Sequence, residues 1–351
     1  MNVAIVTQPL LGNYGGLLQN FALQRILIQN NYCPITLDYF PKKPLKLSAR
    51  QFLKSLFCGN ISDFTLYYGR SSVINSFVEK NIRTSHPIHS YCSSDIKADN
   101  IEAVIVGSDQ VWRPRYNGKV LYDMYLSFLD NYPCRKISYA ASLGVDYWEY
   151  STEQTKACRR LIEQFDAVSV REKSAIKLIQ DKLGYRQVEH VLDPTLLISA
   201  NEYLDLCKDE KINDKIIGCY ILDQSQFKVE IVNKVSDTLN LPYVICSNYV
   251  TSGFSVEKWL AMFRDSEYIV TDSFHGVVFS IIFKKQFIVI ANDKRGGDRF
   301  SSLLSLFNLS NRIIQSIDEI DGLHTIDYSE VYNILHKYKD YSIDFLLSSL
   351  K

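Results

Sequence analysis

Short apolar runs alternate with amphipathic stretches along most of the chain. In the first half, runs rich in β-branched residues predict strands at 2–7, 34–39, 103–108, 136–142, 167–172 and 187–193. Patterns with a helical period fall between them, most clearly at 16–31, 152–165 and 173–184. This alternation is typical of parallel sheets whose strands are joined by crossover helices.

The same pattern resumes after Pro194, which interrupts any regular element near that position. The second series predicts strands at 216–222, 242–247, 267–272 and 287–292, and helices at 225–239, near 255–264 and from about 274. We therefore predict an α/β protein with two open α/β domains in tandem, 1–195 and 196–351, and a cleft between them. Aromatic and charged residues beyond Ser316 predict one or two amphipathic helices at the end of the chain.

Composition narrows the class of protein but does not change this fold. A chain of 351 residues with 46% hydrophobic residues exceeds the usual size of one core, so two domains are expected. Lys plus Arg and Asp plus Glu balance at 39 each, so no overall field favours nucleic acid. No run is apolar enough to span a membrane and no signal peptide begins the chain, so we expect a cytoplasmic protein.

The cysteines and acidic residues do not form a metal-binding pattern. The eight cysteines lie far apart in the sequence and include no C-x-x-C pair. No acidic cluster indicates a dedicated divalent site either. We expect no metal, and the sequence does not predict an oligomeric state.

The segment 42–57 differs from the rest of the chain. Five basic residues and no acidic residue lie between Lys42 and Lys54, interleaved with Leu and Phe. Such a face could contact anionic lipid headgroups at the inner face of the membrane. A solvated helical insertion packed on its own domain is the alternative that we favour.

Because open α/β sheets bind ligands at the carboxyl ends of their strands, the polar residues there are the candidate site. The first predicted strand leads into GNYGG, which contains Asn13, Gly15 and Gly16. Free N–H groups at the following helix start could face an anionic or hydroxyl-rich ligand. The turn is not G-x-G-x-x-G, which disfavours a nicotinamide cofactor. A tight strand-to-helix turn without a ligand is equally compatible with the spacing.

Two more strands of the first half end in polar residues. VIVGSDQVW places Ser108, Asp109 and Gln110 at a strand end, where hydroxyls of a sugar could be bound; helix capping is the alternative. AVSVREKSA places Arg171 where a guanidinium could bind a carboxylate or phosphate. A surface arginine paired with Glu172 or Glu163 is the alternative for this position.

The fourth candidate lies in YIVTDSFHGVV, in the second half of the chain. Asp272 or Ser273 could cap the predicted helix, and His275 falls in its first turn, near the positive end of the helix dipole. Lys294 and Arg295 follow the next predicted strand. An isolated histidine is more often structural than catalytic, but its position at a strand end with nearby basic residues favours an anion-handling site.

These four motifs occur in the order found in the polysaccharide pyruvyl transferase family, which the chain resembles from Met1 to about residue 310. The resemblance implies a GT-B-like fold with two Rossmann-like domains facing across a cleft, in which a C-terminal helix crosses back to the first domain. It also implies transfer of the enolpyruvyl group of phosphoenolpyruvate onto two sugar hydroxyls, which forms a cyclic pyruvate ketal. Phosphoenolpyruvate is then a co-substrate, and no cofactor is expected.

The resemblance also assigns roles to residues. His275 matches the family's essential histidine, for which we expect the role of general acid, and Arg171 matches an arginine thought to grip the donor. Many members have Arg-Leu-His where this chain has Ser273, Phe274 and His275, so one donor-binding arginine is missing. Lys294 or Arg295 compensates for it, or the donor differs. The expected acceptor side comprises Asn13, Gly15, Gly16, Ser108, Asp109 and Gln110.

Two other functions stay open at this point. A glycosyltransferase of the same fold would bind a nucleotide-sugar donor, with Tyr249 or Phe254 stacked on the base. A non-catalytic carbohydrate-binding protein would tolerate replacement of His275. If the protein is a pyruvyl transferase, the expected partner is a saccharide of a cell-surface polysaccharide or its lipid-linked precursor.

Overall fold

The computed structural model describes residues 1–42, 69–129, 132–213, 215–247, 253–291, 298–322 and 324–351. Most of the predicted basic segment 42–57 therefore lies outside the described residues, although Lys42 is described and exposed. Lys294, Arg295 and Tyr249 also lie outside them. None of the helices within the described ranges is long and apolar enough to cross a membrane.

The first half of the chain forms a parallel sheet of six strands with the order β2-β1-β3-β4-β5-β6. Its strands are β1 (Asn2–Val6), β2 (Cys33–Thr36), β3 (Ala103–Val106), β4 (Arg135–Ala141), β5 (Ala167–Val170) and β6 (Val188–His190). Each falls within or overlaps a predicted run, and most are shorter than predicted because the flanking residues enter the loops. The predicted strands of this half are thus confirmed.

Both faces of this sheet are covered by helices, as the apolar runs require. The helices are α1 (Tyr14–Gln29), α3 (Ser72–Asn81), α4 (Ser93–Ala98), α5 (Pro114–Asn117), α6 (Thr152–Ile162) and α7 (Lys173–Leu183). Val3 and Ile5 belong to the core that includes α1, while Ala4 and Val6 belong to the core on the opposite face. This alternation follows from the two-residue period of a strand.

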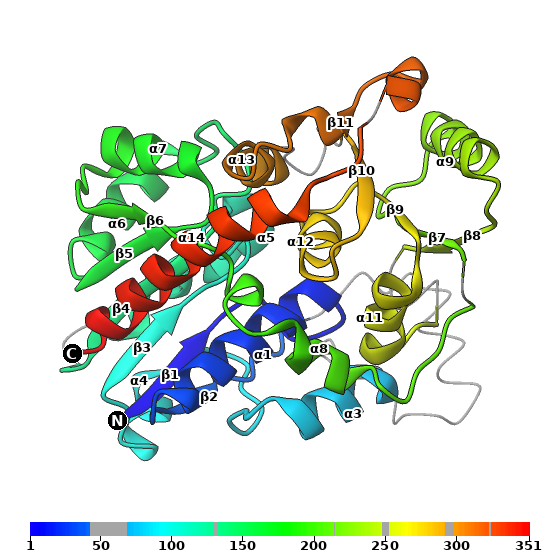
Figure 1. Ribbon diagram of the computed structural model, residues 1–351. Helices are drawn as coiled ribbons and strands as arrows, with labels where there is room; N and C mark the ends of the chain where they lie inside the picture. The colour runs from blue at the N-terminus through cyan, green and yellow to red at the C-terminus, as the bar shows by residue number, and fades with distance from the viewer. Residues whose placement is uncertain (43–68, 130–131, 214, 248–252, 292–297, 323) are drawn as a thin grey trace, which may run out of the picture.

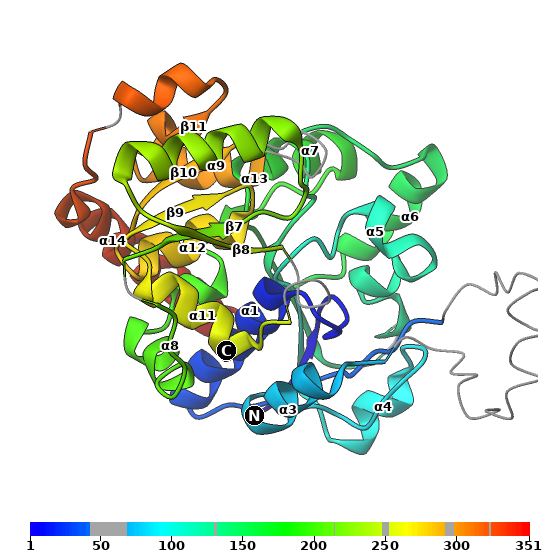
Figure 2. The ribbon, with the colours of Figure 1, turned by 90° about the vertical axis from the view of Figure 1, so that its right-hand side faces the viewer.

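The second half forms a smaller parallel sheet with the order β11-β10-β9-β7-β8. Its strands are β7 (Ile217–Tyr220), β8 (Tyr243–Cys246), β9 (Tyr268–Thr271), β10 (Gln286–Ile290) and β11 (Ile313–Ile314). Its helices are α9 (Gln226–Leu239), α11 (Val256–Asp265), α12 (Phe274–Ile282) and α13 (Asp298–Leu306), and α8 (Ala200–Leu206) precedes the sheet. Figure 2 shows α9 along one face of this sheet, with α11 and α12 on the other.

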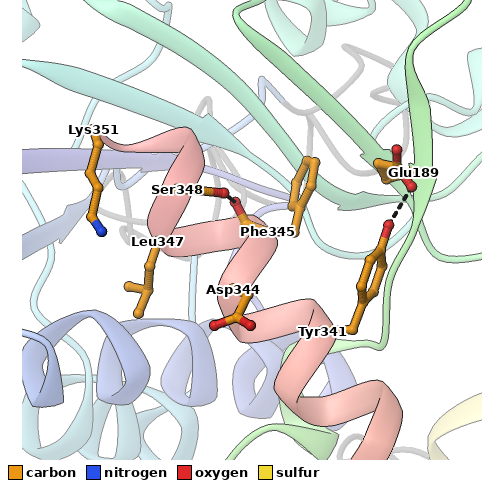
Figure 3. A pocket seen from close by; sticks show the side chains of 7 residues that line it. All are labelled: Glu189, Tyr341, Asp344, Phe345, Leu347, Ser348 and Lys351. Atoms are coloured by element: carbon orange, nitrogen blue, oxygen red, sulfur yellow. Dashed lines mark hydrogen bonds between the residues drawn. The ribbon is translucent and has the colours of Figure 1, made fainter.

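The last helix, α14 (Tyr328–Ser349), returns to the first sheet, as the resemblance implied. Figure 1 shows it running from beside the second sheet toward β4. Ser342 Oγ accepts a hydrogen bond from the Leu192 amide, and the Ser349 carbonyl accepts one from Arg135. In Figure 3 the Tyr341 hydroxyl points to Glu189 and donates to its carboxylate.

One continuous apolar core connects the two halves. It contains Leu17 of α1, Trp259 of α11, Phe279 of α12 and Leu346 of α14, all fully buried. At its edge the Tyr14 ring stacks on Trp259 with centroids 5.4 Å apart, and the Tyr14 hydroxyl donates to the Phe254 carbonyl over 2.7 Å. The two sheets are therefore packed against each other by apolar and aromatic side chains.

The strand orders fix where a ligand site is expected. In the first sheet the chain goes from β1 to one side and later returns to β3 on the other side, and β7 and β9 have the same relation in the second sheet. Crevices at such switch points are the usual ligand sites of open α/β sheets. GNYGG follows β1, Ser108 to Gln110 follow β3, and His275 follows β9, so these candidates lie at the switch points.

Candidate active site

The four sequence motifs meet in one buried group of side chains. Asn13 Nδ2 donates to Asp109 Oδ2 over 3.1 Å, and Arg171 Nη2 lies 3.5 Å from the other oxygen of Asp109. The guanidinium of Arg171 lies over the ring of Phe274 at 4.2 Å. Phe274 is next to His275, and the two rings form an edge contact at 5.2 Å. Residues from both sheets thus form a single site.

Arg171 is at the centre of this group, and its side chain is 1% exposed. Besides Asp109, its guanidinium contacts Asp193 over 2.7 Å and Glu172 over 3.3 Å. The alternative of a surface arginine is therefore wrong: the residue is buried, although Glu172 is one of its partners. Burial alone would lower the pKa of Arg171, but the three carboxylates outweigh burial and raise it.

Asp193 accepts hydrogen bonds on both of its carboxylate oxygens. Its Oδ2 accepts from Arg171 and lies 3.0 Å from Ser108 Oγ, while its Oδ1 accepts from the amide and hydroxyl of Thr195. Burial alone would raise the pKa of Asp193. The charges of Arg171 and His275 and the hydrogen bonds from Thr195 and Arg171 outweigh burial and hold the pKa below its usual value.

His275 lies beside this carboxylate, in the first turn of α12. Its Nε2 is 3.9 Å from Asp193 Oδ2, and the residue is 5% exposed. A protonated imidazole at this distance forms an ion pair with Asp193. Ser273 occupies the N-cap position of α12, but its side chain makes no capping hydrogen bond.

Asp272, which precedes Ser273, connects several elements. Its carboxylate accepts from the amide of Leu222 over 2.7 Å and from Lys228 Nζ over 2.5 Å. It therefore ties the end of β9 to the loop after β7 and to α9. The expected capping hydrogen bond from Ser273 is not found, and Asp272 fixes the position from which α12 starts.

Two glycines allow the close packing around His275. A methyl group built on Gly15 would overlap the His275 ring, and one built on Gly276 would overlap the Thr271 side chain. The first glycine lies at the start of α1 and the second follows the histidine in α12. Gly15 is thus required where the backbone of the first half approaches the imidazole of the second.

The remaining residues expected on the acceptor side lie around the Arg171 and His275 side chains, but not all of them contact these side chains. A methyl on Gly16 would lie 3.3 Å from Asn13 Nδ2, which is a tight contact with a flexible side chain. The Gln110 side chain accepts from Arg113 Nη1 over 2.9 Å, so it is turned toward Arg113. Ser108 Oγ donates to the Ala140 carbonyl or to Asp193. The roles expected for these residues stay predictions.

Asp193 was not predicted, although the sequence contained the signal for it. The run QVEHVLD ends at Asp193, so the rule that polar residues at strand ends form the site would have included this residue. Pro194 follows directly and was interpreted as the start of a domain boundary. In the structure, Asp193 joins the motif residues Ser108, Arg171 and His275.

A comparison with protein families identifies one whose model matches most of this chain. The family model described as polysaccharide pyruvyl transferase matches residues 13–294. That range includes every residue of the group described above. A comparison with curated protein sequences found no match.

Several solved structures share the fold at low sequence identity. The S. aureus MnaA–UDP co-structure has a TM-score of 0.55 at 11% identity, covering 100% of this chain and 97% of that chain. UDP-GlcNAc 2-epimerase from Neisseria meningitidis bound to UDP-GlcNAc has a TM-score of 0.53 at 10% identity, covering 98% and 94%. A glycosyltransferase from Rickettsia africae ESF-5 has a TM-score of 0.51 at 10% identity, covering 100% and 94%.

At such identities these likenesses establish the fold alone. They confirm the predicted GT-B-like arrangement of two Rossmann-like sheets with a C-terminal helix that crosses back. The family model, by contrast, covers most of the chain, including GNYGG from Asn13 onward and the stretch around His275. The chain therefore belongs to the polysaccharide pyruvyl transferase family.

Proposed function

We propose that the protein transfers the enolpyruvyl group of phosphoenolpyruvate onto two hydroxyls of a saccharide, forming a cyclic pyruvate ketal. The saccharide belongs to a cell-surface polysaccharide or to its lipid-linked precursor. The observation that carries this proposal is the convergence of four separate motifs on His275, with Gly15 against the ring and Asp193 beside it. The family match supports the same class of reaction.

In the proposed reaction His275 is the general acid. A sugar hydroxyl attacks C2 of phosphoenolpyruvate while His275 protonates the methylene carbon, which becomes a methyl group. A second hydroxyl then attacks the same carbon and phosphate leaves with its electron pair. The proton of the first hydroxyl restores the proton that His275 gave to the methylene carbon, and the proton of the second hydroxyl leaves with the phosphate.

Asp193 keeps the histidine ready for this step. A carboxylate 3.9 Å from Nε2 favours the imidazolium, the form that can donate a proton. Because Thr195 donates to one oxygen of Asp193 and Arg171 to the other, the carboxylate is held at one place. We therefore assign Asp193 as a positioning residue.

The charges of the described group affect how the donor is held. Asp109, Glu172 and Asp193 outnumber the single guanidinium of Arg171, so the group remains negative even with His275 protonated. A donor with a carboxylate and a phosphate needs further cations. We propose that Lys294 or Arg295 supplies them, and that Arg171 mainly organises the carboxylates behind the donor.

A glycosyltransferase that uses a nucleotide-sugar donor is the second candidate. Ser273 in place of the family arginine and the engagement of Arg171 by protein carboxylates both favour a change of donor. Two of the structural neighbours are described as bound to UDP or UDP-GlcNAc. Phe254, one of the two aromatic residues expected to stack on the base, accepts a hydrogen bond from the Tyr14 hydroxyl through its backbone carbonyl.

The test is an acceptor screen with phosphoenolpyruvate as the donor. The protein is incubated with phosphoenolpyruvate and an array of glycans and lipid-linked saccharides, and products are followed by mass spectrometry and phosphate release. We expect a product heavier by pyruvate less water, released with one phosphate, and no product with His275→Ala. Products formed only with nucleotide sugars would refute pyruvyl transfer.

An encounter with a lipid-linked acceptor would take place at the inner face of the membrane. The basic segment 42–57 is our candidate for peripheral contact there. Binding to vesicles that contain anionic lipid is expected to fall when Lys42, Lys43 and Lys46 are replaced by Glu. Unchanged vesicle binding would remove this part of the proposal.

A further inference from the structure

A cavity of about 490 Å³ opens in the first half of the molecule, away from the His275 group. It lies between the residues that follow β1, the end of the β2 segment and the stretch after α5. Its described lining residues that matter here are Gln8, Tyr39, Lys42, His89, Tyr116 and Lys119. Apart from Lys42, which begins the basic segment 42–57, none of these lining residues belongs to a motif used above.

The charged residues of the cavity wall are lysines. Lys42 and Lys119 are exposed and line the cavity together with His89, and no Asp or Glu is among its described lining residues. Asp123 lies near Tyr39, where burial and this carboxylate raise the pKa of the phenol, so that Tyr39 stays a hydrogen-bond donor. Two lysines with no acidic lining residue favour a negatively charged ligand.

Two tyrosines give the same wall rigid aromatic surfaces. Tyr116 is 46% exposed, and the guanidinium of Arg113 lies over its ring at 4.8 Å. Tyr39 stacks on Tyr91 at 4.9 Å, and Tyr91 stacks on Phe128 at 5.3 Å. Tyr116 therefore offers an exposed ring that suits the C–H face of a sugar, while Tyr39, which is 9% exposed, forms part of the fixed wall beside it.

Hydrogen bonds connect the cavity wall to the loop after β3. Gln8 Nε2 donates to the Gln110 carbonyl and to Asn117 Oδ1, both over 2.9 Å. Asn117 Nδ2 donates to the same Gln110 carbonyl over 3.0 Å. Asp109, the neighbour of Gln110, contacts Arg171 in the His275 group. One loop therefore borders both the cavity and the candidate active site.

We propose that this cavity binds the anionic part of the saccharide acceptor, a sugar that carries a phosphate or a carboxylate. The inference rests on the proposed function, because it assigns the acceptor of that reaction its binding place. The lysines bind the negative group, and Tyr116 contacts the sugar ring.

The test measures binding without any donor, so that it is independent of the chemistry at His275. Saturation-transfer NMR is recorded with glucose 1-phosphate, glucuronate, glucose and inorganic phosphate in separate titrations. The proteins are the wild type, Lys119→Glu, Tyr116→Ala and the control Lys156→Glu, an exposed lysine on α6. Thermal unfolding of each variant verifies that it is folded.

We expect at least one of the two anionic sugars to bind the wild type and the control equally, and to bind more tightly than glucose. Which of them binds identifies the anionic group. Lys119→Glu should weaken this binding about fivefold or more, and Tyr116→Ala should weaken sugar binding but not phosphate binding. The proposal is overturned by binding of neither anionic sugar, by equal binding of glucose, or by an unaffected Lys119→Glu variant. If the cavity proposal fails in this way, binding of phosphoenolpyruvate in the absence of any acceptor would still support the proposed function.

Discussion

Arg171 is the residue around which the charges of the candidate site are arranged. Its guanidinium holds Asp109, Glu172 and Asp193 at 3.5, 3.3 and 2.7 Å and packs on Phe274 from the other half of the molecule. Buried ion pairs are costly to form but also costly to break, because the remaining partner is left uncompensated. At the scale of single residues, the site is therefore sensitive to loss of any one charge.

The contact between Gly15 and His275 leads to a prediction about activity. The neighbouring Gly16 provides the control. Gly15→Ala should lower kcat by about a hundredfold, because its methyl group overlaps the imidazole and displaces it from its reactive position. Gly16→Ala should cause a much smaller loss, because its methyl meets only the Asn13 side chain at 3.3 Å. Steady-state phosphate release measures both. Equal effects of the two substitutions would argue against the role of His275.

The lowered pKa of Asp193 predicts a pH-dependent effect on stability. A carboxyl with a folded-state pKa below its unfolded value of about 3.9 stabilises the fold above that value, and this contribution is lost as the pH falls through the folded pKa. Asp193→Asn should thus lower the free energy of unfolding by about 3 kcal/mol at pH 7. The difference from the wild type should shrink below about pH 4.

Urea unfolding at several pH values measures this difference. Asp181→Asn, at an exposed position on α7, is the matched control and should change the free energy of unfolding little at any pH. A difference between Asp193→Asn and the wild type that persists unchanged in acid would contradict the ionised, paired state assigned to Asp193.

At the scale of elements, the long periodic segments could be predicted and the short ones could not. The strands with continuous apolar runs, such as β3 and β9, and the helix α1 match the predicted ranges closely, and α12 begins where a helix start was predicted. α8 has only 7 residues and β11 only 2, too few for periodicity to identify them. The pairing of Arg171 with Asp193 depends on tertiary contacts, which a pattern along one sequence does not contain.

The last helix is the element whose packing is most directly testable. Leu346 of α14 is fully buried in the core shared by the two halves, whereas its neighbour Leu347 is only partly buried. Leu346→Ala should lower the free energy of unfolding by about 3 kcal/mol, and Leu347→Ala by less than about 1 kcal/mol. Chemical denaturation compares the two. Similar losses would mean that α14 does not pack against the first sheet as described.

At the scale of the whole molecule, the two sheets share a core rather than meeting only at a polar cleft. Trp259 and Phe279 from the second half pack in the same cluster as Leu17 and Tyr14 from the first. The site lies at the end of this cluster, where the switch points of both sheets meet. The domain boundary predicted near 195 stays a prediction.

The shared core predicts that the two halves unfold together. Amides of β1 and β3 should lose protection from hydrogen exchange at the same denaturant concentration as those of β9 and β10, because opening either half exposes the common cluster. Hydrogen exchange followed by mass spectrometry measures both sets. Separate transitions for the two sheets would show that the shared core does not couple them.

Calorimetric titration of the purified protein shows directly which donor it binds. Phosphoenolpyruvate and UDP are titrated separately into the wild type and into His275→Ala. We predict that phosphoenolpyruvate binds the wild type, that the substitution weakens this binding, and that UDP does not bind. Binding of UDP without binding of phosphoenolpyruvate would contradict the account, and would mean that Ser273 marks a change to a nucleotide-sugar donor.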